Sequence, residues 1–514
     1  MRILCALSAL LLVVSCRTPE DPAEEKKGFS KGFLWGSAVA GFQVDMGCPT
    51  LAPEKCEDRH SDWYAWVTTP ELVQDPTTHI AGHPISDSPG FWELFEGDFD
   101  RAKNELGSNA FRMSIEWSRV FPTSTVGVEG YEALKAVANA DAVAQYHRMF
   151  QALRARGLTP LVTLHHYLLL SWIHDALGCH KDIATCQRKG WVDREGTVRE
   201  IAKYAGFVAR EFGGEIDLWA TLNEPMAVVL SGFIFPSAER TNPPGVTMKV
   251  NEARTAMAAM IEAHARMYDA VKANDTADAD GDGSAATVGL VHAMNATAPK
   301  DPNNRLDRKA AENLFYLFTG AFLNGVARGD MDEDLDGKAE HRADLANRMD
   351  YIGINYYTRS TVESTSDGSP ALPDLSPLTT FNPLNIGVWE TYPRGLYEMA
   401  MLVKEQYGKP VYVTENGTQD ARDDGTGPAF IVPHVTWLER AARDGADVRG
   451  YFYWTLMDNY EWNHGTNWRM GLYAVEPKDP QKVRTARKSV GVYRKLADAN
   501  GVPAELLEQY PAPE

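Results

Sequence analysis

The sequence predicts a single (β/α)8 barrel with long loops, of the α/β class. Eight short apolar runs recur along the chain, amphipathic stretches lie between them, and polar or aromatic residues gather where most of the runs end. Alternating strands and helices indicate a parallel sheet, and eight such units are more typical of a closed barrel than of a doubly wound sheet. The predicted strands span residues 33–38, 110–115, 160–164, 218–222, 288–292, 351–355, 411–414 and 450–456.

Two amphipathic stretches supply clear helices for the outer layer of this barrel. Residues 141–156 lie between the second and third predicted strands, and residues 198–212 lie between the third and fourth. Their apolar residues recur at the spacing that puts them on one helix face. No linker or change of composition divides residues 28–514, so we predict one barrel domain over that range.

The overall charge limits the kinds of molecule that the protein is expected to bind. The 514 residues include 51 Lys and Arg against 70 Asp and Glu, which gives a formal net charge of −19. That average repels nucleic acid and anionic membrane surfaces. We therefore expect no nucleic-acid partner, and membrane contact only through an anchor.

The first 27 residues are predicted to be a targeting signal followed by a flexible tether. Arg2 precedes an apolar run over residues 3–14, which is too short to span a bilayer as a helix and is typical of a secretory signal. The following Ser15-Cys16 resembles the cleavage site of bacterial lipoproteins. That resemblance implies a signal peptide over 1–15, lipidation of Cys16, and a flexible tether over 16–27; Arg17 favours the outer membrane. An ordinary signal peptide with an incidental cysteine is the alternative.

Export would make the remaining cysteines candidates for disulfides. Cys48 and Cys56 are eight residues apart, and Cys179 and Cys186 are seven apart. In an oxidising compartment local pairing is the simplest arrangement, although four cysteines allow three pairings and free thiols remain an alternative. A zinc site is less favoured, since neither pair has the usual ligand spacing.

Two carboxylates stand at the ends of predicted strands. Glu224 follows Thr-Leu-Asn and precedes a proline, and Glu415 follows Tyr-Val-Thr and precedes Asn-Gly. In a parallel barrel, strand ends meet at one face, where the chemistry of such enzymes is found. Two facing carboxylates there can cleave a glycosidic bond, because one protonates the leaving oxygen while the other attacks carbon or activates water. A pair of solvated rim residues is the alternative.

Several motifs, in order and over nearly the whole chain, resemble glycoside hydrolase family 1. They are FLWG at 33–36, FRMSI at 111–115, TLNEP at 221–225, VTENG at 413–417 and DNYEW at 458–462. SDWY at 61–64 and IEWSR at 115–119 are similar to the archaeal-type branch. The resemblance implies a retaining exo-β-glycosidase, most simply a β-glucosidase with some β-galactosidase or β-fucosidase activity, and no cofactor.

The same resemblance implies roles for individual residues. Glu415 would be the nucleophile and Glu224 the acid and then the base, with Arg112 and Asn355 supporting the nucleophile. Terminal sugars of β-linked glucosides and oligosaccharides would be bound by Gln43, His166, Asn223, Tyr357, Trp454, Glu461 and Trp462. The carboxylate of Glu461 would repel a 6-phosphate, which argues against the 6-phospho-glycosidase branch.

The chain departs from the family pattern at four places. The segment after His166 reads YLLLSW over 167–172, Asp45 stands where Glu is common, and Met470 stands where an aromatic residue is common. The role of Asn295 at the fifth strand is loosely assigned, because the local spacing is shifted. These departures bear on which hydroxyl groups the site selects.

Two acidic segments begin like calcium loops. Their carboxylates alternate along the chain, at Asp278, Asp280 and Asp282 and again at Asp332, Asp334 and Asp336. Neither segment has Glu at the twelfth position. We therefore expect solvated acidic turns and no resident metal, with weak calcium binding as the alternative.

Two other functions compete with hydrolysis. A transglycosidase would use the same covalent intermediate with a sugar acceptor in place of water. A carbohydrate-binding protein on the same fold would lack catalysis, and the presence of both carboxylates with Arg112 and Tyr357 argues against it. Natural aglycone, oligomeric state and membrane leaflet are not fixed by the sequence.

Overall fold

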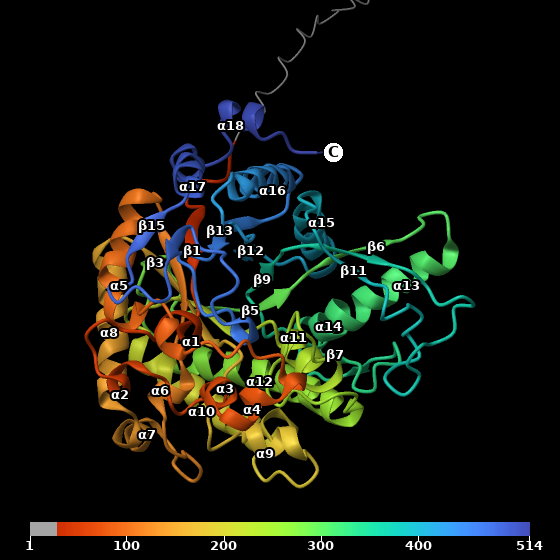
Figure 1. The fold of residues 1–514 in the computed structure, drawn as a ribbon, viewed down its shortest axis with the longest axis horizontal. Helices are drawn as coiled ribbons and strands as arrows, with labels where there is room; N and C mark the ends of the chain where they lie inside the picture. The colour runs from red at the N-terminus through yellow and green to blue at the C-terminus, as the bar shows by residue number, and fades with distance from the viewer. Residues whose placement is uncertain (1–27, 514) are drawn as a thin grey trace, which may run out of the picture.

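The computed structural model describes residues 28–513, which form a closed barrel of eight parallel strands surrounded by helices (Figure 1). The barrel strands are β1 (Leu34–Ala38), β2 (Ala110–Ser114), β3 (Thr159–His165), β4 (Leu218–Asn223), β5 (Thr287–Ala293), β9 (Tyr351–Asn355), β12 (Val411–Asn416) and β13 (Val448–Trp454). They pair in the ring order β1-β13-β12-β9-β5-β4-β3-β2. The predicted fold class is confirmed, and every predicted strand end lies within two residues of an observed end. The predicted signal peptide, Cys16 and the tether fall outside the described residues.

The barrel strands are almost entirely buried, as expected for a parallel sheet covered by helices on its outer face. Along β2 the side chains alternate: Phe111 and Met113 belong to the outer core beneath the helices, whereas Ala110 belongs to the core inside the barrel. Arg112 follows the inward side of this alternation, since its guanidinium reaches residues of β4 and β12 across the barrel. The two-residue period of the strand therefore places a buried cation at the centre of the ring.

The two predicted helices are α8 (Ala140–Ala155) and α10 (Arg194–Phe212). Each begins at a capping side chain: Asn139 accepts from the backbone N–H of Asp141 and Ala142, and Asp193 accepts from that of Gly196. Such caps satisfy N–H groups that the first turn leaves unpaired. Both helices bury one face against the barrel.

The other helices cover the barrel and line its loops. They are α1 (Gly41–Val44), α2 (Pro53–Cys56), α3 (Asp62–Thr68), α4 (Pro70–Gln74), α5 (Phe91–Asp100), α6 (Trp117–Val120), α7 (Tyr131–Val137), α9 (Ala176–Lys181), α11 (Pro225–Val229), α12 (Val250–Asn274), α13 (Arg305–Phe315), α14 (Ala321–Arg328), α15 (Arg394–Leu402), α16 (Thr426–Arg443), α17 (Lys488–Ala499) and α18 (Ala504–Gln509). Shorter 3-10 turns span η1 (Pro76–Thr78), η2 (Ile85–Asp87), η4 (Gly190–Val192) and η8 (Trp462–His464), and π-helical turns span η3 (Arg101–Glu105), η5 (Leu230–Ile234), η6 (Tyr316–Gly320) and η7 (Val403–Tyr407). Over residues 28–513, none of the helices combines the length and the hydrophobicity needed to cross a bilayer.

Small sheets extend the loops beyond the barrel. A three-stranded sheet of β6 (Ala296–Pro299), β10 (Arg359–Val362) and β11 (Gly387–Glu390) lies with α13 at the right of Figure 1. Two-stranded pairs join β7 (Asp330–Met331) to β8 (Glu340–His341) and β14 (Tyr473–Val475) to β15 (Arg484–Ala486). The first two of these sheets lie in insertions between barrel strands, and the β14–β15 pair follows β13, the last barrel strand.

Two disulfides each close a short loop. Cys48 is joined to Cys56, and Cys179 is joined to Cys186. Both pairs are local, which is the arrangement that the spacing favoured. The second bridge holds the turn that follows α9.

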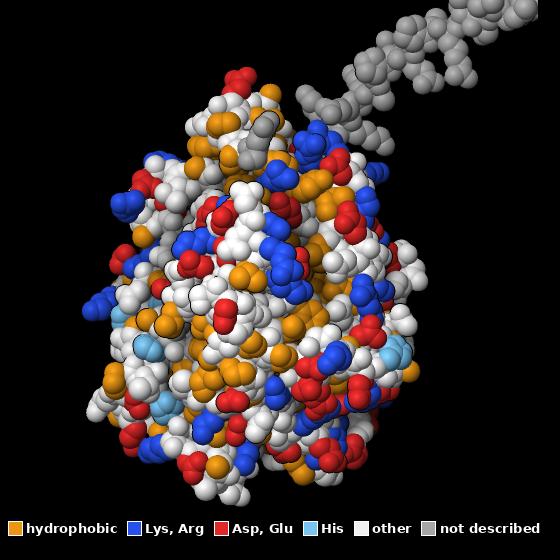
Figure 2. Space-filling view, turned by 90° about the vertical axis from the view of Figure 1, so that its right-hand side faces the viewer, with side chains coloured by type: hydrophobic (Ala, Val, Ile, Leu, Met, Phe, Trp, Pro, Cys, Tyr) orange, Lys and Arg blue, Asp and Glu red, His pale blue; other side chains and the backbone are white. Residues whose placement is uncertain are grey.

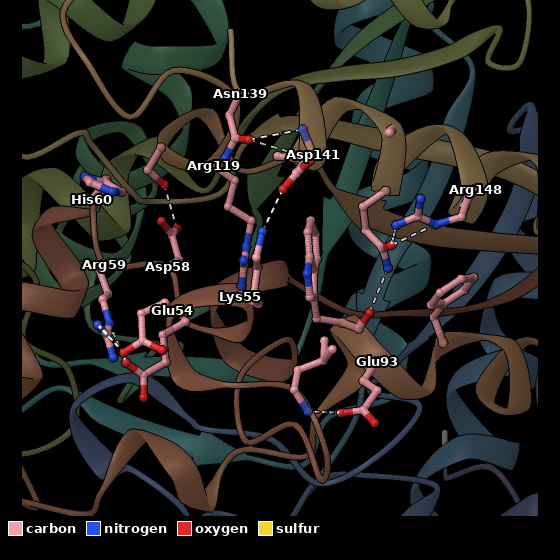
Figure 3. Close-up of a pocket in the computed structure, with 18 residues that line it drawn as sticks. Glu54, Lys55, Asp58, Arg59, His60, Glu93, Arg119, Asn139, Asp141 and Arg148 are labelled. Carbon is pink, nitrogen blue, oxygen red and sulfur yellow. Dashed lines mark hydrogen bonds and ion pairs between the residues drawn. The ribbon is translucent and has the colours of Figure 1, made fainter.

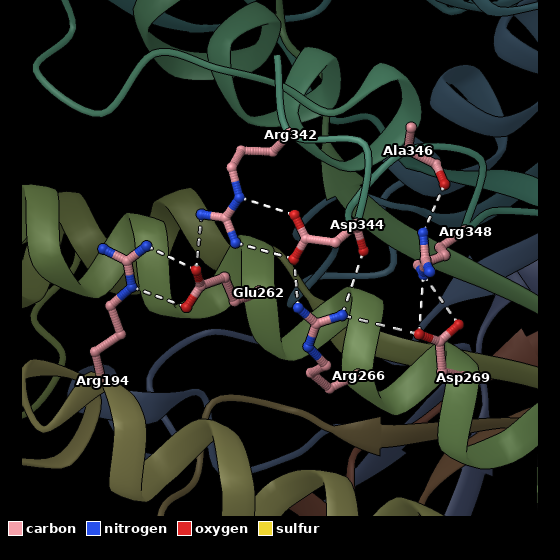
Figure 4. Close-up of polar contacts among 8 residues, drawn as sticks. All are labelled: Arg194, Glu262, Arg266, Asp269, Arg342, Asp344, Ala346 and Arg348. Carbon is pink, nitrogen blue, oxygen red and sulfur yellow. Dashed lines mark hydrogen bonds and ion pairs between the residues drawn. The ribbon is translucent and has the colours of Figure 1, made fainter. Parts of the chain in front are cut away.

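Charged side chains are interspersed by sign over the face seen in Figure 2, where acidic and basic groups alternate without a large patch of either. Many of them pair. Glu262 of α12 accepts from Arg194 of α10 at 2.8 Å and from Arg342 at 3.2 Å, and Arg342 also pairs with Asp344 at 2.8 Å (Figure 4). This network ties the segment after β8 to two helices of the outer layer.

Candidate active site

A cavity of about 400 Å³ opens at the carboxyl ends of the barrel strands. Its lining brings together nine residues that the sequence singled out from distant parts of the chain. They are Gln43, His166, Asn223, Glu224, Tyr357, Glu415, Trp454, Glu461 and Trp462. Arg112 and Asn355 contact the two carboxylates of this cavity from within the barrel. Every predicted substrate and catalytic position is therefore at one place.

Glu415 lies near the end of β12 and is 4% exposed. Its Oε1 accepts from Nη1 of Arg112 at 2.6 Å, and its Oε2 accepts from the hydroxyl of Tyr357 at 2.6 Å. The pairing register between β12 and β9 shifts next to Glu415, which is the kind of irregularity that re-aims a side chain. A buried carboxylate with two strong donors is fixed in position and stabilised in its charged form.

Glu224 comes directly after β4 and caps α11, with Pro225 as the first helical residue. Its backbone is left-handed, with φ of 43°. Its Oε1 accepts from Nδ2 of Asn355 at 2.8 Å, and its Oε2 contacts the hydroxyl of Tyr167. This carboxyl group is partly exposed, so it faces the cavity where a leaving group would lie.

The two carboxyl groups titrate as a pair. The pKa of Glu415 is raised to about 7: burial raises it most, Arg112 partly offsets this by lowering it, and the negative charge of Glu224 also raises it. Near neutral pH the pair therefore shares one proton. Arg112 brings a positive charge to Glu415, whereas the groups that donate to Glu224, Asn355 and Tyr167, are neutral, so the negative charge is favoured on Glu415 and the proton on Glu224. The arrangement suits an acid facing a nucleophile.

Asn223 orients the polar groups between the two carboxylates. Its Oδ1 accepts from Arg112 at 2.7 Å and from Asn355 at 3.1 Å, so its Nδ2 is the end that meets Nε2 of His166 at 3.2 Å. His166 is neutral, because burial lowers its pKa well below the usual value. With Nε2 accepting, Nδ1 of His166 carries the hydrogen. That buried donor has no partner among the described residues.

The far side of the cavity holds a second set of unused hydrogen-bonding groups. Gln43 donates from Nε2 to Oε2 of Glu461 at 2.9 Å, which leaves its buried Oε1 without a partner in residues 28–513. Trp454, from the end of β13, lies on the wall, with its ring stacked at 5.9 Å from that of His166. Unpaired buried donors and acceptors around an indole fit a ligand with several hydroxyl groups on an apolar ring.

The residues that depart from the family pattern lie at different places in the structure. Met470 and Asn295 line the cavity. Asp45 is not among the lining residues: it directly follows α1, 3.2 Å from Nε of Arg119, and burial raises its pKa to about 7. The segment after His166 places Tyr167 against Glu224.

Sequence reasoning missed several cavity residues. Tyr167 lies three residues after the predicted third strand, in the segment 167–172 that the sequence singled out without giving this tyrosine a role. Arg240 and the aromatic residues Phe235 and Trp468 come from loops, and Trp389 comes from β11. No spacing or motif marks any of them. They are brought to the cavity only by the path of the folded chain.

The acidic segments gather as groups of three carboxylates. Asp332, Asp334 and Asp336 have oxygens within 4.8 Å of one another. In the other segment the group is Asp278 and Asp280 with Asp217, and Asp282 is not part of it. Backbone N–H groups already donate to Asp217 and Asp332. Each group could hold a metal ion, and exposed acidic groups of this kind are also common without one.

A larger cavity of about 990 Å³ lies on the flank of the barrel, between α2, α5, α6 and α8 (Figure 3). Its charged groups largely satisfy one another: Lys55 pairs with Asp141 at 2.8 Å, and Arg59 pairs with Glu54 at 3.2 Å. Neither strand-end carboxylate lines it. The smaller cavity is therefore the candidate active site.

Comparison with known proteins gives one family. The model for "Glycosyl hydrolase family 1" matches residues 25–502. A β-galactosidase of Pyrococcus woesei is 35% identical over 94% of this chain and 99% of its own, and β-glucosidase A of Thermotoga maritima is 28% identical over 89% and 95%. The crystal structure of a β-glycosidase from Thermosphaera aggregans superposes with a TM-score of 0.81 at 31% identity, covering 95% of this chain and all of that one.

Proposed function

The chain belongs to glycosyl hydrolase family 1 and is a glycoside hydrolase, and from this premise we propose that Glu415 and Glu224 cleave β-glycosides by double displacement. One observation carries the proposal: Arg112 and Tyr357 hold Glu415 in its charged form, in the cavity that also holds the partly exposed Glu224. A fixed carboxylate beside a proton-bearing one is what a retaining mechanism needs.

In the first step, an oxygen of Glu415 attacks carbon 1 of the sugar as the bond to the leaving oxygen breaks. Glu224 gives its proton to that oxygen, so the aglycone departs as an alcohol and the sugar remains as an ester of Glu415. The loss of charge on Glu415 then allows Glu224 to act as a base.

In the second step, Glu224 takes a proton from water while the water oxygen attacks carbon 1. The ester bond breaks, Glu415 regains its charge, and the sugar leaves with its original β configuration after two inversions. Asn223 is well placed for the 2-hydroxyl, because it lies between the carboxylates with its amide oriented by Arg112 and Asn355.

The substrate we propose is a terminal β-D-glucosyl or β-D-galactosyl residue. The relatives include a β-galactosidase and a β-glucosidase, which supports both sugars. Trp454 would lie under the ring, and His166, Gln43, Glu461 and Trp462 would bind hydroxyl groups around its edge. The carboxylate of Glu461 disfavours a 6-phosphate, although relatives at 27% and 28% identity are 6-phospho-glycosidases.

The proposal is tested with p-nitrophenyl β-glycosides of glucose, galactose, fucose and mannose. The protein should release nitrophenol from at least the first two, and Glu415→Gln should lose that activity by several orders of magnitude. Measurement of transfer products at rising acceptor concentration separates hydrolysis from transglycosylation. Sugar binding without turnover in the unmodified protein would instead favour a carbohydrate-binding protein.

We also propose that the protein is an exported lipoprotein of the bacterial envelope, anchored through Cys16 in the outer membrane. The apolar run over 3–14 before Ser15-Cys16 supports this, and two disulfides suit an oxidising compartment. Labelling with a radioactive fatty acid should mark the protein, and Cys16→Ala should abolish the label. A labelled Cys16→Ala variant would contradict the assignment.

A further inference from the structure

Arg240 is a charged cavity residue that the proposed mechanism does not use. It lies in the segment after η5, which returns from β4 across the cavity. Three contacts fix this segment to the turn that carries Glu461. Asn463 accepts from the N–H of Thr241 at 3.4 Å and donates to the carbonyl of Ala238 at 3.2 Å, and His464 contacts the carbonyl of Glu239 at 2.9 Å. Arg240 is therefore held by the fold and is not a loose surface side chain.

The guanidinium of Arg240 is half satisfied. Its Nη2 lies 3.3 Å from Oε1 of Glu461, while the other oxygen of that carboxylate accepts from Gln43. Its Nη1 is buried and has no hydrogen-bond partner within the part of the chain that the structure describes. A buried donor without a partner carries a desolvation cost. A hydrogen bond from Nη1 to an acceptor on the ligand would offset this cost.

The arrangement of the strands tells which end of a bound sugar meets Arg240. The two catalytic carboxylates come from β4 and β12, which flank β5 and β9, so carbon 1 lies over that half of the ring. Gln43 and Glu461 follow β1 and β13 in the opposite half. Because Asn223 and His166 occupy the edge next to carbon 1, the substituents left for Glu461 are those at carbons 4 and 6.

Gln43 and Arg240, the two residues that donate to Glu461, lie at different depths in the cavity. This difference separates the positions of the two substituents. Gln43 is fully buried, whereas the Arg240 side chain is 27% exposed and therefore stands nearer the mouth. The hydroxyl on carbon 4 is attached directly to the ring, so in a bound sugar it would reach the deep side beside Gln43. The hydroxyl on carbon 6 is on a rotatable exocyclic carbon, which lets it turn toward the mouth beside Arg240.

We propose that Arg240 is a specificity-determining residue that recognises the oxygen on carbon 6 of the terminal sugar. The hydroxyl would donate to Oε1 of Glu461 and accept from Nη1 of Arg240, which uses the unpaired donor. A sugar without this oxygen leaves Nη1 buried and unpaired. The inference rests on the proposed glycosidase function and extends it to a discrimination between galactosides and their 6-deoxy counterparts, the β-D-fucosides.

The test uses two substrates that differ only at this oxygen, p-nitrophenyl β-D-galactoside and p-nitrophenyl β-D-fucoside. The unmodified protein should show the higher kcat/KM on the galactoside. In Arg240→Met both values fall, since Glu461 loses a donor, but the galactoside should fall on the order of tenfold further. Arg240→Lys, which keeps the charge without the fork, should give an intermediate ratio and serves if the Met variant does not fold.

Controls separate this role from a structural one. Arg494→Met, which removes an exposed guanidinium paired with Asp498 on α17, should leave the galactoside-to-fucoside ratio unchanged. An unchanged ratio in both Arg240 variants would overturn the proposal and leave Arg240 as a positioning residue for Glu461. A preference of the unmodified protein for galactoside 6-phosphate over galactoside would also overturn it. Loss of activity on both aryl substrates in Glu415→Gln tests the glycosidase function separately.

Discussion

Nη1 of Arg112 lies 2.6 Å from Oε1 of Glu415, although their strands β2 and β12 are separated in the ring by β1 and β13. Both are buried, and Nη2 of the same guanidinium orients Asn223 at 2.7 Å. One cation therefore stabilises the negative charge of the nucleophile and positions the amide next to it. The alternation of side chains on β2 makes this contact, because it turns Arg112 toward the inside of the ring.

Replacement of Arg112 should damage catalysis and stability together. In Arg112→Met the carboxylate of Glu415 is left buried without its cation, which typically costs about 3–5 kcal/mol of folding free energy. We expect kcat on an aryl glucoside to fall by on the order of 10³, from loss of charge on the nucleophile. Arg112→Lys should recover part of the stability in a urea titration but little of kcat, because it lacks the fork that reaches Asn223.

The pH dependence of kcat/KM should show the shared proton of the catalytic pair. Since burial and charge raise the pKa in this pair to about 7, the one-proton form is lost as the pH rises through that value, and kcat/KM should decline there. Tyr357→Phe removes a donor that lowers the pKa of Glu415, so its decline should begin at higher pH, with a lower maximum. A profile that rises through pH 7 would contradict this assignment of the proton.

Glu415 should make the protein less stable as the pH rises. Its pKa, which reflects the coupling to Glu224, is about 7 in the folded chain and above the value of 4.5 for an unperturbed Glu, so between these pH values the folded pair binds more protons than the unfolded chain does. The free energy of unfolding therefore falls as the pH increases through this window. From pH 5 to pH 8, Glu415→Gln should gain on the order of 2–3 kcal/mol relative to the unmodified protein.

Urea unfolding at the two pH values measures this difference. Any pH-independent cost of leaving Arg112 unpaired cancels in the comparison. Glu195→Gln, which changes a carboxylate whose side chain is 95% exposed, is the control and should show no such shift. Equal pH dependence in Glu415→Gln and the unmodified protein would show that burial does not raise the pKa of this carboxyl group.

Tyr167 should matter for the acid and not for the nucleophile. Its hydroxyl donates to Oε2 of Glu224, so Tyr167→Phe removes a hydrogen bond that positions that carboxyl group. We expect kcat to fall by about 10- to 100-fold on substrates with poor leaving groups, and less on p-nitrophenyl glycosides, whose departure needs little acid assistance. Tyr64→Phe, which breaks a Tyr–Glu hydrogen bond outside the cavity, is the matched control. An equal loss on both substrate types would argue against a role through Glu224.

The disulfide between Cys179 and Cys186 should contribute stability without contributing to catalysis. Loops of this size are worth roughly 2–3 kcal/mol in the chain-entropy model. The double variant Cys179→Ser, Cys186→Ser should unfold at lower temperature, and its kcat on aryl glycosides should be close to that of the unmodified protein. If reductant lowers the Tm of this double variant as much as that of the unmodified protein, the assigned bridge is not the source of the stability.

The sequence predicted the barrel and the carboxylates because both are local signals. The strand positions follow from apolar runs, and Glu224 and Glu415 stand in motifs at the strand ends. Arg240, Phe235 and Trp389 were missed, because their place depends on how a long loop folds back over the cavity, and no periodicity encodes that path. Asp217 was missed at the acidic segment for a similar reason: it joins Asp278 and Asp280 from a distant part of the chain.

The central claim is that Glu415 attacks carbon 1, and its most direct test is to trap the covalent intermediate. A 2-deoxy-2-fluoro β-glucoside with a good leaving group slows the second step, so the sugar should accumulate on the protein and inactivate it. Mass spectrometry of a digest should then find one fluorosugar, attached to the peptide that carries Glu415. A label on Glu224 or on any other residue, or rapid turnover with inverted product and no label, would contradict the account.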